Sequence, residues 1–317
     1  MGIVLKQSFK NTTVTYIGFA IGAINTLFLY TKIIPETYYG LVAVILATAA
    51  ILTPLMAFGV HNTMIKYYSS LHDDDKDAFL SLMLLSPLLV ILPLAGITYF
   101  LYDLIAEILA QKNGIVKDYL WYIFLIGFAM AYFEIFYAWC KVHLKTVFGN
   151  FLKEVFVRVC VMLLLVLYYF EIITLDLFLK AIVASYLLRT ISINIYAFRV
   201  RKFRLNFNFP KETKAILYYS LLIIFGGSSA VILLEIDKFM INQFVEIENV
   251  AYYGVAVFIA TVIIVPSRAM HNITYPLTAA LLNSKRYTEL GELYKKTSLT
   301  LFIACLLYTS PSPRDRG

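Results

Sequence analysis

Apolar segments of about 20 residues recur along this chain, and each is long enough to cross the roughly 30 Å hydrocarbon core of a bilayer as an α-helix. The composition agrees, because 61% of the residues are hydrophobic, only 15% are charged and the mean hydropathy is +0.77. Strands are excluded, since the segments lack the alternation of barrel strands and an open sheet edge stays unpaired in lipid. The sequence therefore predicts an all-α, polytopic integral membrane protein.

The apolar segments predict eight complete spans, and the basic residues between them predict the orientation. The expected spans are 13–33, 39–59, 80–101, 119–141, 155–174, 177–198, 216–240 and 250–268. Lysine and arginine gather in the N-terminal segment and the even-numbered loops, whereas the odd-numbered loops hold only Lys32, Lys112 and Lys117. The positive-inside rule then places the N-terminus in the cytoplasm. The formal charge of +7 therefore reflects topology and contact with lipid headgroups, and we expect no nucleic-acid partner.

The loops and the rarer residue types confine the function to the helices themselves. No loop between the expected spans is long enough to form a soluble domain. The three cysteines show neither metal-ligand nor disulfide spacing, and the four histidines are dispersed among the expected cytoplasmic loops. We therefore expect no catalytic residue, no metal and no cofactor, and the protein is predicted not to be an enzyme.

Two segments form an internal repeat, "YYGLVAVILAT" (38–48) and "YYGVAVFIAT" (252–261), which match with one gap. Each copy follows a span and a short outer loop, and each precedes a charged amphipathic segment on the cytoplasmic side. Because six spans separate the copies, both start on the same side of the membrane, which is typical of two parallel six-helix lobes. We predict a complete first lobe at 1–204 and the start of a second lobe at 205–304.

The C-terminal string "CLLYTSPSPRD" (305–315) explains why the second lobe is short. A ninth span begins at Thr297, but polar residues follow after about a dozen positions, which is too few to cross a bilayer. The string is similar to one reading frame of a transposase-type sequencing adaptor; the alternative is a short Pro-rich cytoplasmic tail. We expect native sequence to end near Ala304, residues 305–317 to be non-native, and the seventh and eighth helices to carry an uncovered apolar face.

Six further strings occur in the order and helix placement of one transporter family. They are "IIPETYYG" (33–40), "FGVHNTMIKYYS" (58–69), "TVFGNFLKEVFVRV" (146–159), "EIDKFMINQFVEIENVAYYG" (235–254), "VPSRAMHNITYPL" (265–277) and "LGELYKKTSLTL" (290–301). Together with the repeat, they make the chain resemble the polysaccharide-type, Wzx-like flippases of the MOP transporter superfamily. The resemblance implies two six-helix lobes around a central cavity, with transport by alternating access.

The resemblance also implies a substrate and a location. Such flippases move an undecaprenyl-pyrophosphate-linked oligosaccharide from the inner to the outer leaflet of a bacterial inner membrane, for surface polysaccharides such as lipopolysaccharide. We expect membrane lipids as partners, H⁺ or Na⁺ as a coupling ion, and a monomer at full length. One alternative is a cation-coupled multidrug exporter of the same superfamily, which would favour an acidic, aromatic cavity. Another is an integral-membrane glycan polymerase or ligase, which would need a large outer loop.

Three arginines are the candidate ligands for the pyrophosphate, because arginine keeps its charge and its forked donors match phosphate oxygens. Arg189 lies deep in the sixth span, so we expect it either to face the cavity or to form a structural pair with Glu134. Arg158 begins the fifth span and Arg268 ends the eighth, where a lipid pyrophosphate would arrive. Both also fit the alternative of basic anchors at the cytoplasmic interface.

Four other charged residues within the expected spans are candidates for gating or ion coupling, because a charge in the membrane costs on the order of 3 kcal/mol. Glu235 and Lys238 are spaced i, i+3 and can pair on one helix face. With Asp237, they lie near the outer end of the seventh span, where they either anchor the helix or gate the outer mouth. Glu134 in the fourth span is a candidate coupling site or, alternatively, holds two helices together by a hydrogen bond.

Small residues in two spans predict close packing and bending. Gly18 and Gly22 form a GxxxG step in the first span, and Gly226 with Ala230 repeats that spacing in the seventh. We expect a close helix contact at each step. The paired small residues of "FGGSS" (225–229) also predict a hinge.

Overall fold

The computed structural model describes residues 2–202, 204–261, 274, 278, 281–282 and 285–309. Within these residues all regular structure is helical and no strand occurs. Five helical segments are long and apolar enough to cross a membrane, namely Phe9–Ile33, Glu36–Met56, Asp75–Phe100, Gly114–Val142 and Leu175–Val200. Thr213–Ser229 and Val231–Phe244 make a sixth if they are counted as one span. The prediction of an all-α, polytopic membrane protein is confirmed.

The helices follow one another with short connections. The first are α1 (Gly2–Ile24), η1 (Asn25–Leu29), α2 (Tyr30–Ile33), α3 (Glu36–Met56), α4 (Val60–Tyr67), η2 (Tyr68–Ser70), α5 (Asp73–Leu85), α6 (Leu88–Phe100), α7 (Tyr102–Leu109), η3 (Gly114–Tyr119) and α8 (Leu120–Val142). The next are α9 (Thr146–Phe151), η4 (Leu152–Phe156), α10 (Val157–Tyr169), α11 (Leu175–Val200), α12 (Thr213–Phe244), α13 (Glu248–Thr261) and α15 (Tyr287–Thr309). The segments η1 and η4 are π-helical turns inside longer helices, a feature that often marks functional sites.

The expected spans agree with these helices in most of the chain. The fifth expected span is an exception: it belongs to a helix that runs continuously from Thr146 to Tyr169, and this helix is not among those apolar enough to cross. The charged residues Lys153, Glu154 and Arg158 lie in the first half of that helix. The eighth is described only as far as Thr261. The ninth lies within α15, which is not among the helices that are apolar enough to cross. Of the expected non-native tail, residues 310–317 lie outside the described residues.

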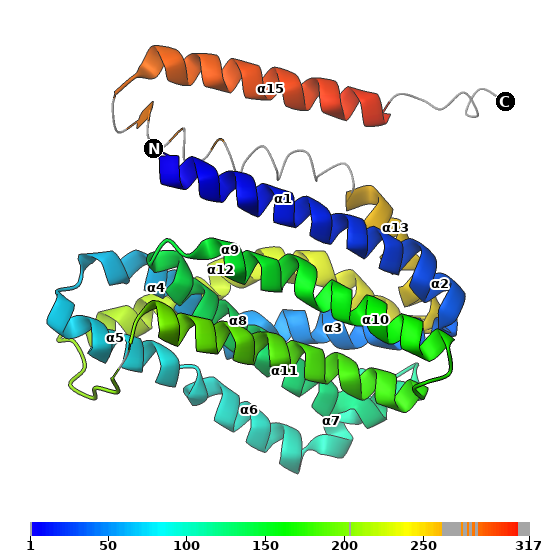
Figure 1. The fold of residues 1–317 in the computed structure, drawn as a ribbon. Coiled ribbons are helices and arrows are strands. Elements are labelled where there is room, and N and C mark those ends of the chain that lie inside the picture. Colours follow the sequence, from blue (N-terminus) through cyan, green and yellow to red (C-terminus); the bar gives the residue numbers. More distant parts are fainter. Residues whose placement is uncertain are drawn as a thin grey trace.

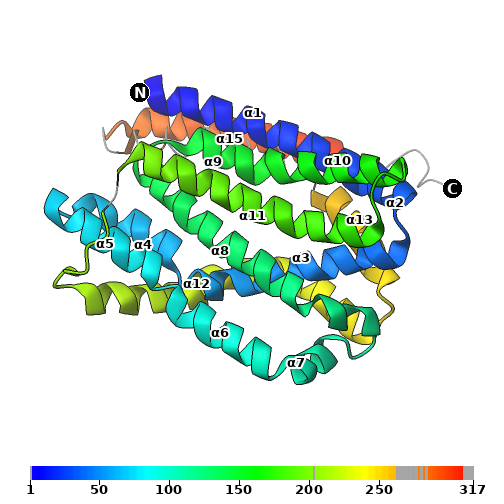
Figure 2. The ribbon, with the colours of Figure 1, turned by 60° about the horizontal axis from the view of Figure 1, so that its bottom comes forward.

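The central helices lie side by side in the order α11, α8, α3 and α12, and they run along the bundle in roughly similar directions (Figures 1 and 2). Large apolar side chains such as Phe79, Phe133, Trp139 and Phe178 are fully buried among them. Burial of such side chains from water or lipid gives the close packing on which membrane helix association depends. On its outward side, α12 exposes apolar side chains such as Phe225 at 72%, so the expected uncovered face is present on this helix.

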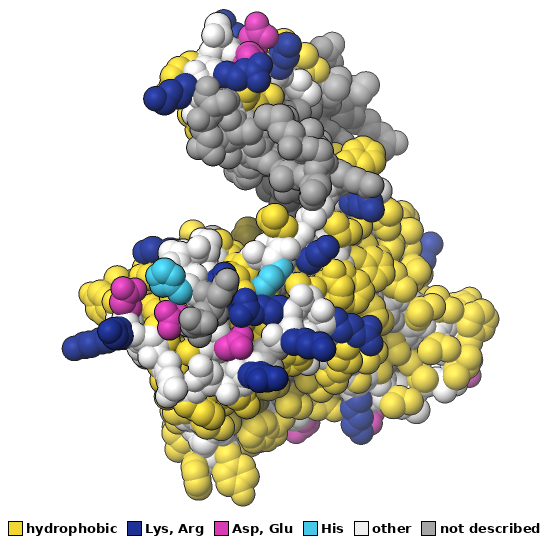
Figure 3. All heavy atoms as spheres, turned by 60° about the vertical axis from the view of Figure 1, so that its left-hand side comes forward, with side chains coloured by type: hydrophobic (Ala, Val, Ile, Leu, Met, Phe, Trp, Pro, Cys, Tyr) yellow, Lys and Arg dark blue, Asp and Glu magenta, His cyan; other side chains and the backbone are white. Residues whose placement is uncertain are grey.

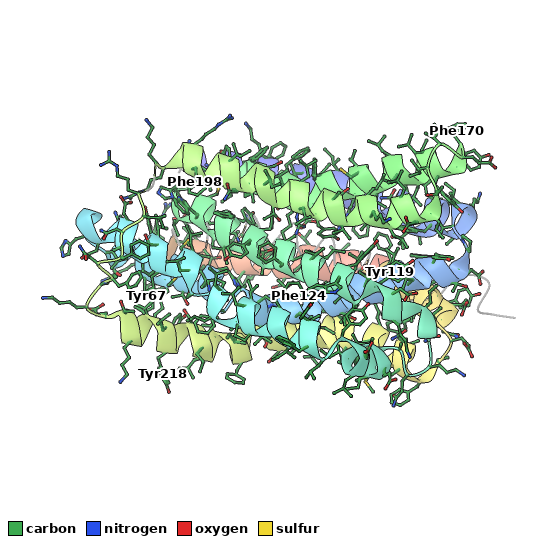
Figure 4. All side chains as sticks on the ribbon, turned by 90° about the horizontal axis from the view of Figure 1, so that it is seen from below. Tyr67, Tyr119, Phe124, Phe170, Phe198 and Tyr218 are labelled. Atoms are coloured by element: carbon green, nitrogen blue, oxygen red, sulfur yellow. The ribbon has the colours of Figure 1, made fainter. Side chains whose placement is uncertain are left out.

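Charged and aromatic side chains mark the two ends of the bundle. Figure 3 shows lysine and arginine side chains gathered on the end that carries the α4–α5 and α8–α9 connections. Figure 4 places Tyr67, Phe198 and Tyr218 toward this end, and Tyr119 and Phe170 toward the other, with Phe124 between them. Aromatic side chains at both ends are typical of the two membrane–water interfaces.

The glycines of the first expected span pack as predicted, whereas Gly226 does not. A Cβ on Gly18 would lie 2.4 Å from the carbonyl oxygen of Glu154, so only glycine lets α1 approach η4 this closely. A Cβ on Gly226 would meet nothing within 4 Å, so the expected close contact in the seventh span is wrong. A bend is present where the sequence predicts a hinge, because the two halves of α12 meet at 57° after Ser229; motion at this bend stays a prediction.

Candidate functional site

A cavity of about 410 Å³ opens between the helices of the first six spans and the pair α12–α13. Its walls come from α1, η1, α2, α3, α8, α10, α11, α12 and α13. Small residues of α3, among them Ala43 and Ala47, line one part of the cavity, and the aromatic residues Tyr30, Tyr39 and Tyr186 line another. Three charged side chains line it, namely Arg158, Glu235 and Lys238. The cavity therefore brings these three ionisable groups together between packed helices.

The α12 pair predicted from spacing is present. Lys238 Nζ lies 2.7 Å from Glu235 Oε2, and the two side chains are 19% and 26% exposed. Asp237 points elsewhere, because its carboxylate accepts a hydrogen bond from the hydroxyl of Tyr253 at 2.5 Å. The structure therefore brings Glu235 and Lys238 into the cavity and leaves Asp237 to hold α12 against α13.

Arg158 reaches the cavity from the first turn of α10. Its Nη1 lies 3.4 Å from Glu154 Oε2, one turn earlier in η4. Its side chain lies along α1, where Gly22 leaves room for it, since a Cβ there would be 3.3 Å from the Arg158 Cδ. Asn25, the first residue of η1, donates from Nδ2 to the Arg158 carbonyl oxygen at 2.8 Å. The GxxxG face of α1 and the η4 turn thus position the guanidinium together.

Arg189 lies outside this cavity. Its guanidinium carbon lies 4.2 Å from the ring centroid of Phe133 and 4.8 Å from that of Tyr186, and the residue is only 7% exposed. The expected alternative of an Arg189–Glu134 ion pair is wrong, because Glu134 pairs with Lys153 Nζ at 2.6 Å. Arg189 is not among the lining residues and adjoins the cavity through Tyr186. Its assignment as a pyrophosphate ligand stays a prediction.

Glu134 belongs to a charged cluster outside the cavity lining, and this cluster joins α8, η4 and the start of α4. Lys153 is its ion-pair partner, and this contact is the helix-to-helix bond that the sequence offered as one alternative. His61 is close enough for its pKa to respond to the cluster: burial lowers the pKa of His61, and Glu134 partly opposes that shift. The ring Nδ1 of His61 is buried and has no hydrogen-bond partner. Arg268, the third candidate ligand, lies outside the described residues.

Sequence analysis missed a network that fastens the end of α12 to the α7–η3 turn. Asn113 Nδ2 donates to the carbonyl oxygens of Asn242 at 2.7 Å and Val245 at 2.9 Å, and Asn113 Oδ1 accepts from the Ile247 N–H at 3.0 Å. Asn242 and Gln243 both donate to the Leu109 carbonyl oxygen. Asn113 and Asn242 are buried, 6% and 0% exposed. We call these five residues, with Ile247, the Asn113 clasp.

The contacts beside the Asn113 clasp fasten the same end of α12 and α13 to the rest of the bundle. Lys112 Nζ pairs with Glu246 at 3.0 Å. Thr37 at the start of α3 donates to Glu248 at 2.5 Å, and Tyr252 donates to Glu36. The α12–α13 turn lies directly on α3, because a Cβ on Gly40 would come within 2.1 Å of the Ile247 carbonyl oxygen. The two helices that contain the repeat copies, α3 and α13, therefore contact each other at this end.

The comparison with protein families decides what kind of molecule this is. The model of the polysaccharide biosynthesis protein family matches residues 4–280, which is most of the chain. The chain belongs to the polysaccharide biosynthesis protein family. No curated protein and no solved structure matches it. Membership supports the Wzx-like resemblance and a flippase role in polysaccharide biosynthesis for this multi-pass membrane protein.

Proposed function

We propose that the protein flips a polyprenyl-pyrophosphate-linked oligosaccharide across a bacterial inner membrane by alternating access. The observation that carries this proposal is the cavity between the helices of the first six spans and α12–α13, with Arg158 on one wall and Lys238 on another. Two cations at membrane depth suit a pyrophosphate, whose charge must be balanced while it leaves water. The sugar would cross inside the cavity while the polyprenyl chain stays in lipid.

The carboxylates beside these cations suggest how the site works without substrate. Glu154 and Glu235 each pair with the cation of their own helical segment, which reduces the cost of holding charge in the membrane. A pyrophosphate offers more negative oxygens and bidentate geometry to Arg158, so it competes with the single Glu154 contact. Exchange of partners, without loss of either cation's charge, then lets the substrate bind and leave.

The Asn113 clasp and the contacts of Glu36, Thr37 and Lys112 supply the closed side for alternating access. They fasten α12 and α13 to the helices of the first six spans at the end opposite the basic cluster. With the N-terminus and the basic end in the cytoplasm, as the positive-inside rule places them, this arrangement corresponds to a state closed toward the outside. Substrate would enter from the cytoplasmic end, and breaking the clasp would release it outward. The two predicted lobes are the moving parts, and the working unit is a monomer.

The test is a flipping assay in vesicles that contain the purified protein and a fluorescent polyprenyl-pyrophosphate oligosaccharide. Arg158→Gln and Lys238→Gln each remove one cavity cation while keeping a polar side chain, and we expect each to slow flipping at least tenfold. Lys180→Gln is the matched control, because Lys180 pairs with Asp176 at 2.6 Å on an exposed helix face away from the cavity. Normal flipping by the Arg158→Gln, Lys238→Gln double variant would overturn the proposal.

A further inference from the structure

Three polar groups of residues that line one side of the cavity have no hydrogen-bond partner in the described part of the chain. Tyr30 and Tyr186 are 7% and 8% exposed, and their hydroxyls make no hydrogen bond there. Asn25 is 4% exposed, and its Oδ1 also lacks a partner. All three residues line the cavity that Arg158 lines.

The position of the Asn25 oxygen follows from its neighbour. The side-chain amide contacts the Arg158 carbonyl oxygen at 2.8 Å, and a carbonyl oxygen can only accept. The nitrogen must therefore face Arg158, which leaves Oδ1 as the remaining acceptor at the cavity wall. The π-helical turn that begins at Asn25 displaces this side chain from the regular register of α1.

These groups contribute nothing to stability as they stand. A buried polar group without a hydrogen bond is unfavourable, and phenylalanine or leucine would fill the same space without that cost. In the described part of the chain some buried hydroxyls are satisfied, such as those of Thr190, which donates to the Ala129 carbonyl oxygen at 2.7 Å, and Thr63, which contacts Ser220 at 2.7 Å. The hydroxyls of Thr12, Thr48 and Ser86 are buried without a partner but do not line this cavity. Unpartnered groups that gather around one cavity call for a ligand, as buried polar groups normally do.

We infer that Asn25, Tyr30 and Tyr186 bind the first sugar of the lipid-linked oligosaccharide, next to the phosphate-binding Arg158. A sugar hydroxyl both donates and accepts, so it satisfies a tyrosine hydroxyl in either sense and donates to the Asn25 oxygen. The tyrosine rings offer apolar faces to the sugar ring, with Tyr30 already held by stacking on Tyr39 at 4.5 Å between centroids. This assignment rests on the proposed function and adds to it the residues that bind the sugar.

Binding of two lipids that differ only in the sugar separates this inference from the proposed function. The probes are a polyprenyl pyrophosphate and the same lipid carrying one hexose, and native mass spectrometry of the purified protein gives their relative affinities. We expect the wild type to prefer the glycosylated lipid. Tyr30→Phe and Tyr186→Phe should each reduce that preference about 3- to 10-fold, the effect of one lost hydrogen bond. Asn25→Leu also removes the donor to the Arg158 carbonyl oxygen, so it should reduce the preference at least as much and weaken both lipids as well.

Three control measurements show whether a change in preference comes from the sugar contact. Arg158→Gln should weaken both lipids equally and leave the preference unchanged, since it acts on the shared pyrophosphate. Tyr132→Phe is the matched control, because its hydroxyl donates to the Leu84 carbonyl oxygen at 3.3 Å outside the cavity, and the preference should stay. The Tyr30→Phe and Tyr186→Phe proteins should keep the wild-type melting temperature, since those hydroxyls stabilise nothing.

Each outcome has one meaning. An unchanged preference in all three sugar-site variants overturns the inference, even where both lipids bind and the proposed function stands. The absence of binding of either lipid to the wild type overturns the proposed function, and the inference with it. A lower melting temperature in both tyrosine variants would show that the hydroxyls have a structural role, which also contradicts the inference.

Discussion

In the proposed transport cycle the Asn113 clasp holds the outer end shut, so the substitution Asn113→Ala should open the cavity toward the outside. The side chain contributes hydrogen bonds to the Asn242 and Val245 carbonyl oxygens and accepts one from the Ile247 N–H, all between 2.7 and 3.0 Å. At about 1 kcal/mol net for each buried hydrogen bond, the closed state loses about 3 kcal/mol, or roughly 150-fold in its equilibrium with an open state. The stability of the separate helices should change much less, because the clasp joins segments that are far apart in sequence.

The assay is labelling of a cavity cysteine from outside the membrane. Ala47→Cys places a small thiol in the cavity lining, in a background where the native cysteines are replaced by alanine, and a membrane-impermeant maleimide reports access. We expect Asn113→Ala to raise the labelling rate by up to about 100-fold, in keeping with the population shift. Asn249→Ala is the matched control, because Asn249 makes one exposed hydrogen bond to the Glu246 carbonyl oxygen. Equal labelling rates in Asn113→Ala and the parent would refute this account of the clasp.

Three further predictions concern stability. Gly18→Ala should lower the free energy of unfolding by about 1–3 kcal/mol, because of the clash between α1 and η4, and so lower the melting temperature. Gly226→Ala should raise the melting temperature slightly because the site is open; the opposite order would contradict the packing described. A double-mutant cycle of Glu134→Gln and Lys153→Met should give a coupling energy of about 1 kcal/mol, since both side chains are partly exposed, and a coupling near zero would remove the pair from the helix contact. Burial holds the pKa of His61 below its value in the unfolded chain, so the unfolded state binds more protons at low pH. The stability of the protein should therefore fall as the pH drops below about 6.5. His61→Phe should remove this pH dependence in melting curves recorded from pH 7.5 to 5, and an unchanged dependence would contradict the prediction.

Span positions and local pairs could be predicted because they depend on short-range patterns. Twenty apolar residues give a helix that crosses the bilayer, and the i, i+3 spacing of Glu235 and Lys238 gives their ion pair. The Gly18 and Gly22 step likewise predicted a close contact without naming its partner, the η4 turn. Each of these inferences needs only one helix and its periodicity.

The direction in which a single side chain points from its helix could not be predicted. A membrane helix is apolar on all sides, so its sequence carries little information about which face lines a cavity. Arg189 therefore looked as suitable as Arg158, although the structure places it between aromatic rings. The partner of Glu134 was likewise open between neighbouring helices, and η4 supplied Lys153.

The Asn113 clasp was missed for a different reason. Its central residues, Asn113 and Asn242, are 129 positions apart and meet only after the helices have packed. A buried amide near the end of an apolar helix was the available signal, and Asn242 closes the segment "LLEIDKFMIN". Sequence analysis assigned the functional role to its charged neighbours Glu235, Asp237 and Lys238. The neutral Asn242 instead forms the buried hydrogen bonds to residues far away in the sequence.

The measurement that tests the central claim most directly is the headgroup dependence of flipping in vesicles. The same fluorescent oligosaccharide is attached to a polyprenyl chain through a pyrophosphate or through a neutral linker, and the protein-dependent flipping rates are compared. If Arg158 and Lys238 hold the pyrophosphate, the charged lipid should flip at least tenfold faster, and the double variant Arg158→Gln, Lys238→Gln should abolish that difference. Equal rates for the two lipids in the wild-type protein would contradict the account.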